Sequence, residues 1–357
     1  MNGRPSPPRS LCLLRLSALG DVSHAVPVLR ALQQQWPQTA LTWIIGRFEH
    51  RLVGDLPGVE FIVFDKKQGW RGHAALRRQL AGRRFDALLH MQVAMRANLV
   101  SAWVGADRRI GYDRARSKDL HGLFIGERIA ERHGQHVLDA FFSFLEPLGL
   151  EIPAVPRWDI PVPDAAHAFA RAALPGEQPT LLLSPCSSHP LRNWRAERYA
   201  AVADHAVRRH GWRVLLCGGP SELERRMGDA ILVAARVPII DLIGRDTIKQ
   251  LQALLTRASA VLSPDSGPLH MANAAGTPVI ALHAASNPAR SGPYSERRYV
   301  IDRYDAAARK FLGRPAEELP WGKKVEVDGA MDLIEVDAVT AALDRLVADR
   351  GGRGHSP

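Results

Sequence analysis

Short apolar runs alternate with longer amphipathic stretches along most of the chain. The runs LCLLRLS (11–17) and LTWIIG (41–46) are almost continuously hydrophobic, as expected of strands that are buried on both faces of a sheet. Between them, the stretch 24–36 places Val26 and Leu29 on one side of a helix. Because strands and helices alternate in this way, the chain is predicted to be an α/β protein whose parallel sheets are covered by helices.

A proline-rich segment, 153–166, interrupts this alternation near the middle of the chain. Proline lacks a backbone N–H and blocks helix formation, so the segment is typical of a linker between domains. We therefore expect a first domain over residues 1–155 and a second over 156–335, in which the alternation restarts. The last helical pattern, within 336–350, is expected to pack back on the first domain.

Two doubly wound, Rossmann-like domains in tandem are expected to face each other across a cleft. In sheets of this kind, ligands bind beyond the carboxyl ends of the strands, where the strand order reverses. Functional residues are therefore expected in the loops that follow the predicted strands.

The composition excludes several classes of protein. The three cysteines form no CxxC pair, which argues against a zinc module and against a secreted disulfide framework. No apolar run reaches the ~18 residues that a membrane-spanning helix needs. The first apolar run contains Arg15 and leads into a helix pattern, which favours a strand over a signal peptide. We therefore expect a cytoplasmic protein.

The chain is strongly basic, and the charge is uneven. It carries 47 Lys and Arg against 37 Asp and Glu, a net charge of +10, with 21 basic and 13 acidic side chains in residues 1–150. This asymmetry indicates an anionic partner for the first half: nucleic acid, an anionic membrane or a phosphorylated substrate. A generally arginine-rich composition would also account for it. Signatures of nucleic-acid-binding folds are absent from the sequence, so we expect no nucleic-acid partner.

The motif SALGD (17–21) follows the first predicted strand. Gly20 allows a tight turn, and Asp21 lies at the start of a helix. Asp21 has two interpretations: a helix cap, which the spacing alone favours, or a carboxylate base directed toward a ligand. The motif is not GxGxxG, so it does not indicate a nicotinamide or flavin site.

Two loops of the second domain have the composition of sites that bind parts of a nucleotide. In SPCSSHPLRNW (184–194), Ser187 and Ser188 offer hydroxyls and amides beside the Arg192 guanidinium, although a plain surface loop has the same composition. In CGGPSELE (217–224), Glu222 could accept hydrogen bonds from ribose hydroxyls or simply stabilise the start of a helix.

A third motif, PDSGPLH (264–270), is the densest in polar groups. A turn at Asp265, Ser266 and Gly267 opens a helix, and His270 lies one turn further along. The free amides at a helix start can hold a phosphate, whereas Asp265 would repel one and would instead contact a hydroxyl. The motif is also compatible with a capping aspartate beside a half-buried histidine.

These motifs carry a resemblance to a known family. The chain resembles the family 9 glycosyltransferases, the ADP-heptose:lipopolysaccharide heptosyltransferases, most specifically in DSGPLH (265–270), then in GDVSHAVP (20–27), then in SSxxxRNW (187–194). The pattern SxxGDVxHxxPxL at the start is most similar to heptosyltransferase I.

The resemblance implies a GT-B fold and an inverting, metal-independent transfer without a cofactor. The donor would be ADP-L-glycero-D-manno-heptose, bound by the second domain, and the acceptor would be the Kdo-bearing inner core of lipid A, bound by the first. Asp21 matches the catalytic base of the family. The donor-binding positions would be Ser187, Ser188, Arg192, Glu222, Asp265, Ser266, Gly267 and His270. Arg192 stands where the family usually has lysine.

The basic first half then acquires an explanation. The acceptor is anionic and belongs to a membrane, so we expect a monomer that lies peripherally at the cytoplasmic face of the inner membrane. Candidate acceptor-binding residues are Ser17, Gly20, Lys66, Lys67 and Arg71.

One stretch, 287–324, is longer than the family leads us to expect. It leaves open a family 9 transferase of another sugar or acceptor. Two further classes of protein are compatible with the sequence: a non-catalytic binder of anionic surfaces or nucleic acid, and an epimerase of the same two-domain build.

Overall fold

The structure, a computed structural model, describes residues 6–353 and divides into two compact units. Unit 1 ends at Pro161 and unit 2 begins at Val162. The sequence placed this boundary after residue 155. The later position has a local cause, because Arg30 donates hydrogen bonds to the carbonyls of Trp158 and Asp159 and so holds the proline-rich segment on unit 1.

Unit 1 contains one parallel sheet of six strands in the order β3-β2-β1-β4-β5-β6. The strands are β1 (Ser10–Leu14), β2 (Ala40–Gly46), β3 (Val59–Phe64), β4 (Arg84–His90), β5 (Gly105–Gly111) and β6 (Glu127–Arg128). Strand β1 pairs with β2 on one side and with β4 on the other, so the strand order reverses there. The loop after β1 therefore opens at the position where such sheets bind ligands.

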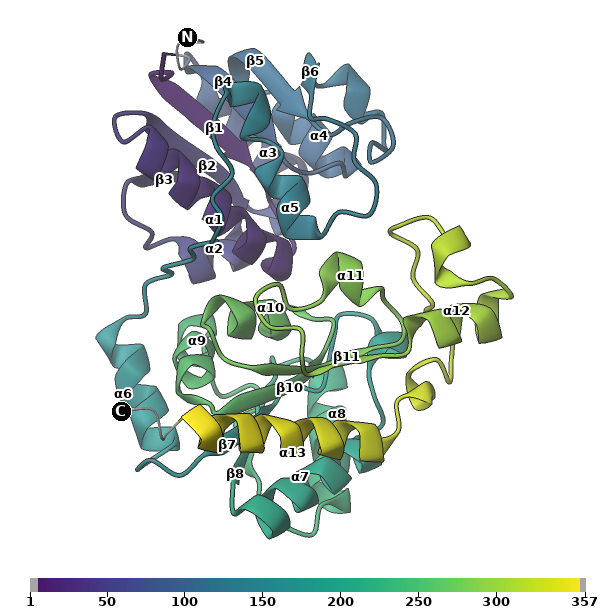
Figure 1. Cartoon of the computed structure of the whole chain (residues 1–357). Helices are drawn as coiled ribbons and strands as arrows, with labels where there is room; N and C mark the ends of the chain where they lie inside the picture. Colours follow the sequence, from purple (N-terminus) through teal and green to yellow (C-terminus); the bar gives the residue numbers. More distant parts are fainter. Residues whose placement is uncertain (1–5, 354–357) are drawn as a thin grey trace. The chain divides into compact units, whose positions relative to one another are not determined.

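Helices cover this sheet (Figure 1). They are α1 (Leu19–Gln35), α2 (Arg47–Val53), α3 (Gly69–Leu80), α4 (Met95–Ser101) and α5 (Val137–Phe142), with short 3₁₀ turns η1 (Lys66–Gln68), η2 (His121–Leu123) and η3 (Glu146–Leu148). The core between helices and sheet is apolar, with Leu14, Ile44 and Leu88 fully buried. As expected of a strand covered on both faces, β1 is buried from Leu11 to Leu14.

Unit 2 repeats the plan, with strand order β12-β11-β10-β7-β8-β9. The strands are β7 (Thr180–Leu183), β8 (Arg213–Leu216), β9 (Ile240–Asp241), β10 (Ala260–Pro264), β11 (Val279–His283) and β12 (Val300–Asp302). The reversal lies between β7 and β10, which pair in parallel. The loops after these two strands are the loops in which the sequence predicted a donor site, and they share one edge of the sheet.

Among the described residues, unit 2 has more helices than unit 1. They are α6 (Asp164–Ala173), α7 (Ala196–His210), α8 (Glu222–Ala234), α9 (Ile248–Arg257), α10 (Gly267–Ala274), α11 (Pro288–Ser291), α12 (Tyr304–Leu312) and α13 (Val336–Arg353), with 3₁₀ turns η4 (Pro190–Arg192), η5 (Ala316–Glu318) and η6 (Met331–Leu333). Across residues 6–353, none of the helices combines the length and the apolar content needed to cross a membrane.

The last helix, α13, packs on unit 2 and not on the first domain, where the sequence led us to expect it. It lies against α7 and beside β11 and β12 (Figure 1). Its apolar side chains Val339, Leu343 and Leu346 are fully buried in the core of unit 2. The amphipathic pattern was correct, but it does not specify which apolar surface the helix covers.

Candidate functional site

Asp21 lies in the first turn of α1, directly beyond the carboxyl end of β1. Its Oδ2 accepts a hydrogen bond from the Ala18 backbone N–H at 3.3 Å, which closes the start of the helix. The side chain is also 33% exposed, so the carboxylate can still reach a ligand. Asp21 thus helps to close the start of α1 and remains accessible to a ligand, although the capping position itself is Ala18.

Arg15 holds the Asp21 carboxylate from the other side. Its guanidinium forms an ion pair with Asp21, donates to the Met91 carbonyl at 2.6 Å and lies 5.2 Å from the centre of the Phe141 ring. Arg15 is itself nearly buried and therefore fixes the direction of the carboxylate. The sequence did not assign it a role. The feature of the sequence that could have pointed to Arg15 is its position, since it is a charged residue directly after a continuous apolar run.

The candidate acceptor residues lie along one edge of the sheet of unit 1. Lys66 and Lys67 form η1 after β3, Arg71 follows in α3, and all three side chains are exposed. They share the carboxyl edge with Asp21, but the strand order places β2 between β3 and β1.

The two candidates in the loop after β1 have different surroundings. Ser17 accepts a hydrogen bond from Gln92 Nε2 at 3.4 Å, and Gly20 is buried in the first turn of α1. A buried glycine packs and presents no side chain, so Gly20 shapes the loop.

Asp265 follows β10 directly and is almost wholly buried. Its Oδ2 accepts hydrogen bonds from Lys324 Nζ and Ser291 Oγ, each at 3.0 Å, and its Oδ1 lies 3.5 Å from His270 Nε2. Burial by itself would raise the pKa of the carboxyl. The hydrogen bond from His270 and the charge of Lys324 outweigh burial and hold this pKa well below its usual range. Asp265 is therefore a permanently ionised group with a built set of partners.

The start of α10 lies beside this carboxylate. Ser266 is the N-cap residue, but its hydroxyl shares a 2.9 Å hydrogen bond with Ser263 and does not cap the helix. Gly267 opens the helix. The first amides of α10 thus remain available to an anionic group, as the sequence predicted for a phosphate.

The loop after β7 has a different arrangement from the one we expected. Ser187 is buried and donates its backbone N–H to Asn193 Oδ1 at 2.7 Å, whereas Ser188 is exposed. Arg192, in η4, donates from Nε to Glu326 Oε1 at 2.7 Å. The guanidinium that was expected to face a diphosphate is thus already paired with an acidic side chain.

Lys324 and Glu326 are residues of this site that the sequence did not reveal. Lys324 is the last residue of the long stretch 287–324 and Glu326 lies just beyond it. Between them, the backbone N–H of Val325 donates to the Ala285 carbonyl, just beyond β11, at 2.9 Å. Val325 is buried, and its two neighbours extend to Asp265 and Arg192. The unexpected stretch therefore returns the chain to the candidate donor site and supplies one cation and one anion to it.

The two glutamates after β8 have distinct roles. Glu224 accepts from the Gly219 backbone N–H at 2.7 Å, and its own backbone N–H donates to the hydroxyl of Ser221, which caps the helix. Glu222 is 81% exposed and pairs with Arg226 one turn further along α8. Glu222 therefore faces solvent at the mouth of this loop, and any ribose contact requires it to leave Arg226.

A further carboxyl, Asp246, lies close to Glu224 at the same edge of the sheet. Burial raises its pKa to about 7, and the charge of Glu224 adds to this effect. Within the described residues, no group forms a hydrogen bond with its buried Oδ2. Thr247 provides the cap of α9, so Asp246 is not used as a helix cap.

Asp246 leads to a prediction about pH. An aspartate in an unfolded chain titrates near ~3.9, so the folded state binds this proton more tightly and loses stability as the pH rises from about 4 through about 7. The Asp246→Asn variant has no carboxyl to ionise here, so it should avoid up to ~4 kcal/mol of the stability that the wild type loses as the pH rises. When both proteins are unfolded with urea at pH 5, 6.5 and 8, the free energy of unfolding of the variant should increase relative to that of the wild type as the pH rises. Asp229→Asn, on the exposed face of α8, serves as the control. Parallel pH profiles of wild type and Asp246→Asn would contradict the assignment.

Comparison with known proteins adds to this geometry. The profile of glycosyltransferase family 9 (heptosyltransferase) matches residues 73–321. The lipopolysaccharide core heptosyltransferase OpsX of Haemophilus influenzae is 39% identical over 339 residues, which cover 95% of this chain and 97% of the relative. Its name specifies neither type I nor type II, so the resemblance to heptosyltransferase I stays a prediction.

Two solved structures share the fold. A family 9 glycosyltransferase from Veillonella parvula superimposes with a TM-score of 0.78 at 22% identity, over 96% of this chain and 97% of that one. The E. coli ADP-heptose lipopolysaccharide heptosyltransferase II superimposes with a TM-score of 0.70 at 19% identity, over 96% and 99%. These matches confirm the expected GT-B class with its two Rossmann-like sheets.

Proposed function

The chain belongs to glycosyltransferase family 9 and is a heptosyltransferase of lipopolysaccharide core biosynthesis, and on this premise we propose that it transfers heptose from ADP-L-glycero-D-manno-heptose to the Kdo-bearing inner core of a lipid A precursor. The observation that best supports this proposal is the built site around Asp265: a buried, ionised carboxylate beside a free helix start.

On the donor side, Asp265 accepts hydrogen bonds from heptose hydroxyls, and the amides of Ser266 and Gly267 bind the diphosphate. His270 holds Asp265 in place. A carboxylate this close to a diphosphate would repel it unless a cation lay between them, and Lys324 is placed to be that cation. The Arg192 guanidinium leaves the Glu326 carboxylate and binds a phosphate oxygen instead. The remaining nucleotide contacts are made by Ser187, Ser188 and Glu222.

The leaving ADP accumulates negative charge as the glycosidic bond breaks. Preorganised cations and helix amides stabilise that charge without having to reorganise during the reaction. Lys324 and the start of α10 supply preorganised groups of this kind from the chain itself, and Arg192 adds a second cation once it has left Glu326, so the scheme requires no metal ion.

On the acceptor side, the Asp21 carboxylate removes the proton from the attacking hydroxyl. The hydroxyl oxygen bonds to the anomeric carbon while the bond to ADP breaks, and the configuration at that carbon inverts. Arg15 keeps Asp21 oriented throughout. Proton transfer of this kind needs a carboxylate that is both fixed and accessible, and the geometry of Asp21 meets both conditions.

The exposed cations at the carboxyl edge of unit 1 fit the same acceptor. Lys66, Lys67 and Arg71 surround Trp70, which is 76% exposed, and an exposed aromatic ring among cations favours contact with an anionic lipid surface. We therefore assign the acceptor to unit 1 and expect the enzyme to act, as a monomer, at the cytoplasmic face of the inner membrane.

The test is an assay with defined substrates. Purified enzyme, ADP-L-glycero-D-manno-heptose and Kdo-lipid A should release ADP and give an acceptor that mass spectrometry shows to carry one additional heptose. Release that occurs only with a different ADP-sugar would replace the donor and support a family 9 transferase of another sugar. Turnover of the donor without any acceptor would indicate an epimerase instead, and inactivity with all ADP-sugars would overturn the proposal.

A further inference from the structure

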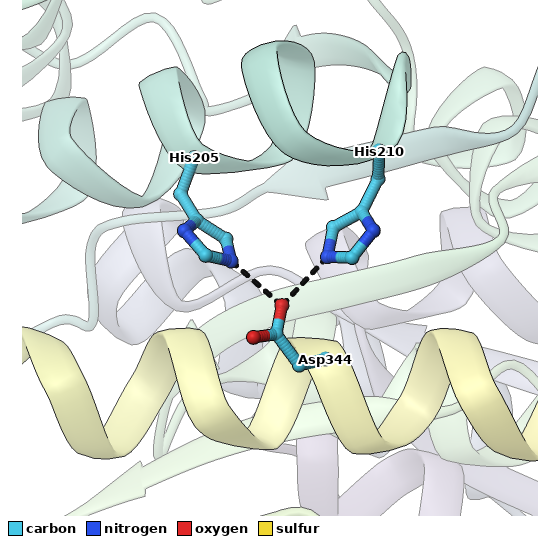
Figure 2. Close-up of side chains that lie close together, drawn as sticks. All are labelled: His205, His210 and Asp344. Atoms are coloured by element: carbon cyan, nitrogen blue, oxygen red, sulfur yellow. Dashed lines mark hydrogen bonds and ion pairs between the residues drawn. The ribbon is translucent and has the colours of Figure 1, made fainter.

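A group of metal-ligating side chains lies outside the site described above. His205 and His210 belong to α7 and Asp344 belongs to α13. Figure 2 shows both imidazole rings turned toward the same carboxylate oxygen. Each Nε2 lies 2.6 Å from Asp344 Oδ1, and the ligand atoms all lie within 4.8 Å of one another.

The group is at the opposite edge of unit 2 from the donor loops. Helix α7 runs from the loop after β7 back to the start of β8, so its last turn lies at the amino edge of the sheet. His210 is the final residue of α7, where the negative end of the helix dipole favours a cation. The catalytic proposal therefore makes no use of these residues.

The packing of two helices holds the three side chains together. Buried side chains of α13, among them Val339 and Leu343, fix it against unit 2, and the three ligands sit at the rim of this contact. Their side chains are 24%, 14% and 36% exposed for His205, His210 and Asp344. A bound ion would be shielded by protein on one side and open to water on the other.

The chemistry of the ligands points to one class of ion. Imidazole nitrogen suits zinc and its first-row neighbours, whereas calcium and magnesium prefer sites built from oxygen. Asp344 supplies the carboxylate oxygen, and its Oδ1 already accepts a hydrogen bond from each of the two imidazole Nε2 atoms. Arg209 Nε lies 3.5 Å from the other oxygen, Oδ2, and so leaves Oδ1 as the single ligand atom.

The distances require only a small adjustment. Zinc binds His nitrogen and carboxylate oxygen at ~2.0–2.2 Å, which in tetrahedral geometry separates neighbouring ligand atoms by ~3.3 Å. The present 2.6 Å separations must widen by about 0.7 Å, which rotation of the partly exposed Asp344 side chain allows. Water would supply the fourth ligand on the open side.

We propose that His205, His210 and Asp344 form a binding site for a zinc-class divalent ion that fastens helix α13 to helix α7. As the ion binds, each Nε2 gives up its proton: a neutral ring takes the proton up at Nδ1 through solvent, and a protonated ring releases it to solvent. Because α13 completes the core of unit 2, the expected consequence is greater stability of that unit and not a change in sugar transfer.

The experiment is a zinc titration of the full chain after treatment with a chelator and removal of the chelator. Competition with a fluorescent zinc indicator should give one tight site, and thermal unfolding should rise in temperature as zinc is added. His210→Gln keeps an N–H donor for Asp344 but is a poor zinc ligand. The variant should unfold at the same temperature as the wild type when no metal is present. Its affinity for zinc should fall by more than ~10–100-fold, which is the loss expected when a residue that only supports a ligand is removed. Asp344→Asn should lower it similarly.

His133→Ala is the matched control, because His133 is 89% exposed and lies beside Glu131, and among residues 6–353 the two belong to no group of three metal-ligating side chains. It should bind zinc as the wild type does. Absence of a stoichiometric site in the wild type, unchanged affinity in His210→Gln, or equal loss in His133→Ala would each overturn the proposal and leave a hydrogen-bonded contact between two helices. Because none of these readouts uses transferase activity, they are independent of the proposed reaction.

Discussion

An Asp21→Asn variant is expected to lose ~10²–10⁴-fold in kcat, the usual contribution of a general base, while its KM for the sugar nucleotide stays close to that of the wild type. Asparagine keeps an oxygen that can accept the Ala18 N–H, so the start of α1 should remain closed. It cannot remove a proton from the acceptor hydroxyl. The kinetic split follows because Asp21 belongs to unit 1, whereas the donor contacts are assigned to unit 2.

The measurement is the rate of ADP release at saturating acceptor, together with an unfolding curve for each protein. Asp107→Asn is the control, since Asp107 is 51% exposed and also pairs with an arginine, Arg84, on the same sheet. That variant should retain full activity. If Asp21→Asn turned over at the wild-type rate, Asp21 would be a helix-capping residue only, as the spacing of its motif alone had favoured.

The alternation of strands and helices was predictable because burial dictates it. Strands that are covered on both faces must be apolar throughout, and β1, β2 and β4 are continuous enough to be recognised. The strand β5 was not predicted. Its first half carries Asp107, Arg108 and Arg109 near an edge of the sheet, where charged side chains remain paired or exposed, so the sequence there resembles a basic surface.

Part of the candidate site was predictable as well, because its residues follow strands that burial makes recognisable. The sequence singles out Asp21, Asp265 and Ser187 as candidates because each follows a recognisable strand, and parallel strands bring such loops to one edge of each sheet. Arg15, Lys324 and Glu326 were not found. The contact of Lys324 with Asp265 joins residues 59 positions apart, and nothing local in the sequence specifies such a partner. The only local signal was the alternation Lys-Val-Glu at 324–326, in which the valine is buried and its two neighbours are polar. Three residues are too few to predict that the polar side chains belong to a site.

The remaining prediction concerns this contact. Lys324→Met is expected to lower the free energy of unfolding by ~3–5 kcal/mol at neutral pH, because it leaves the Asp265 carboxylate buried without its cation. Asp265 is about nine-tenths buried, and the lysine is only 26% exposed, so solvent screens the pair little. His270 and Ser291 remain on the carboxylate and limit the loss. Lys324→Arg keeps the charge and should recover most of the stability.

The same variant separates two roles of the lysine. Lys323→Met is the matched control, since Lys323 is the neighbouring residue, is exposed and engages its partners through backbone atoms. If Lys324 also faces the diphosphate, Lys324→Met should raise the KM for the sugar nucleotide at least ~10-fold, because one charge-assisted hydrogen bond is lost. The KM is measured under conditions where the variant is folded. Loss of stability with an unchanged KM would make Lys324 solely the counter-charge of Asp265. The cation for the departing ADP would then have to be Arg192, which must first leave Glu326.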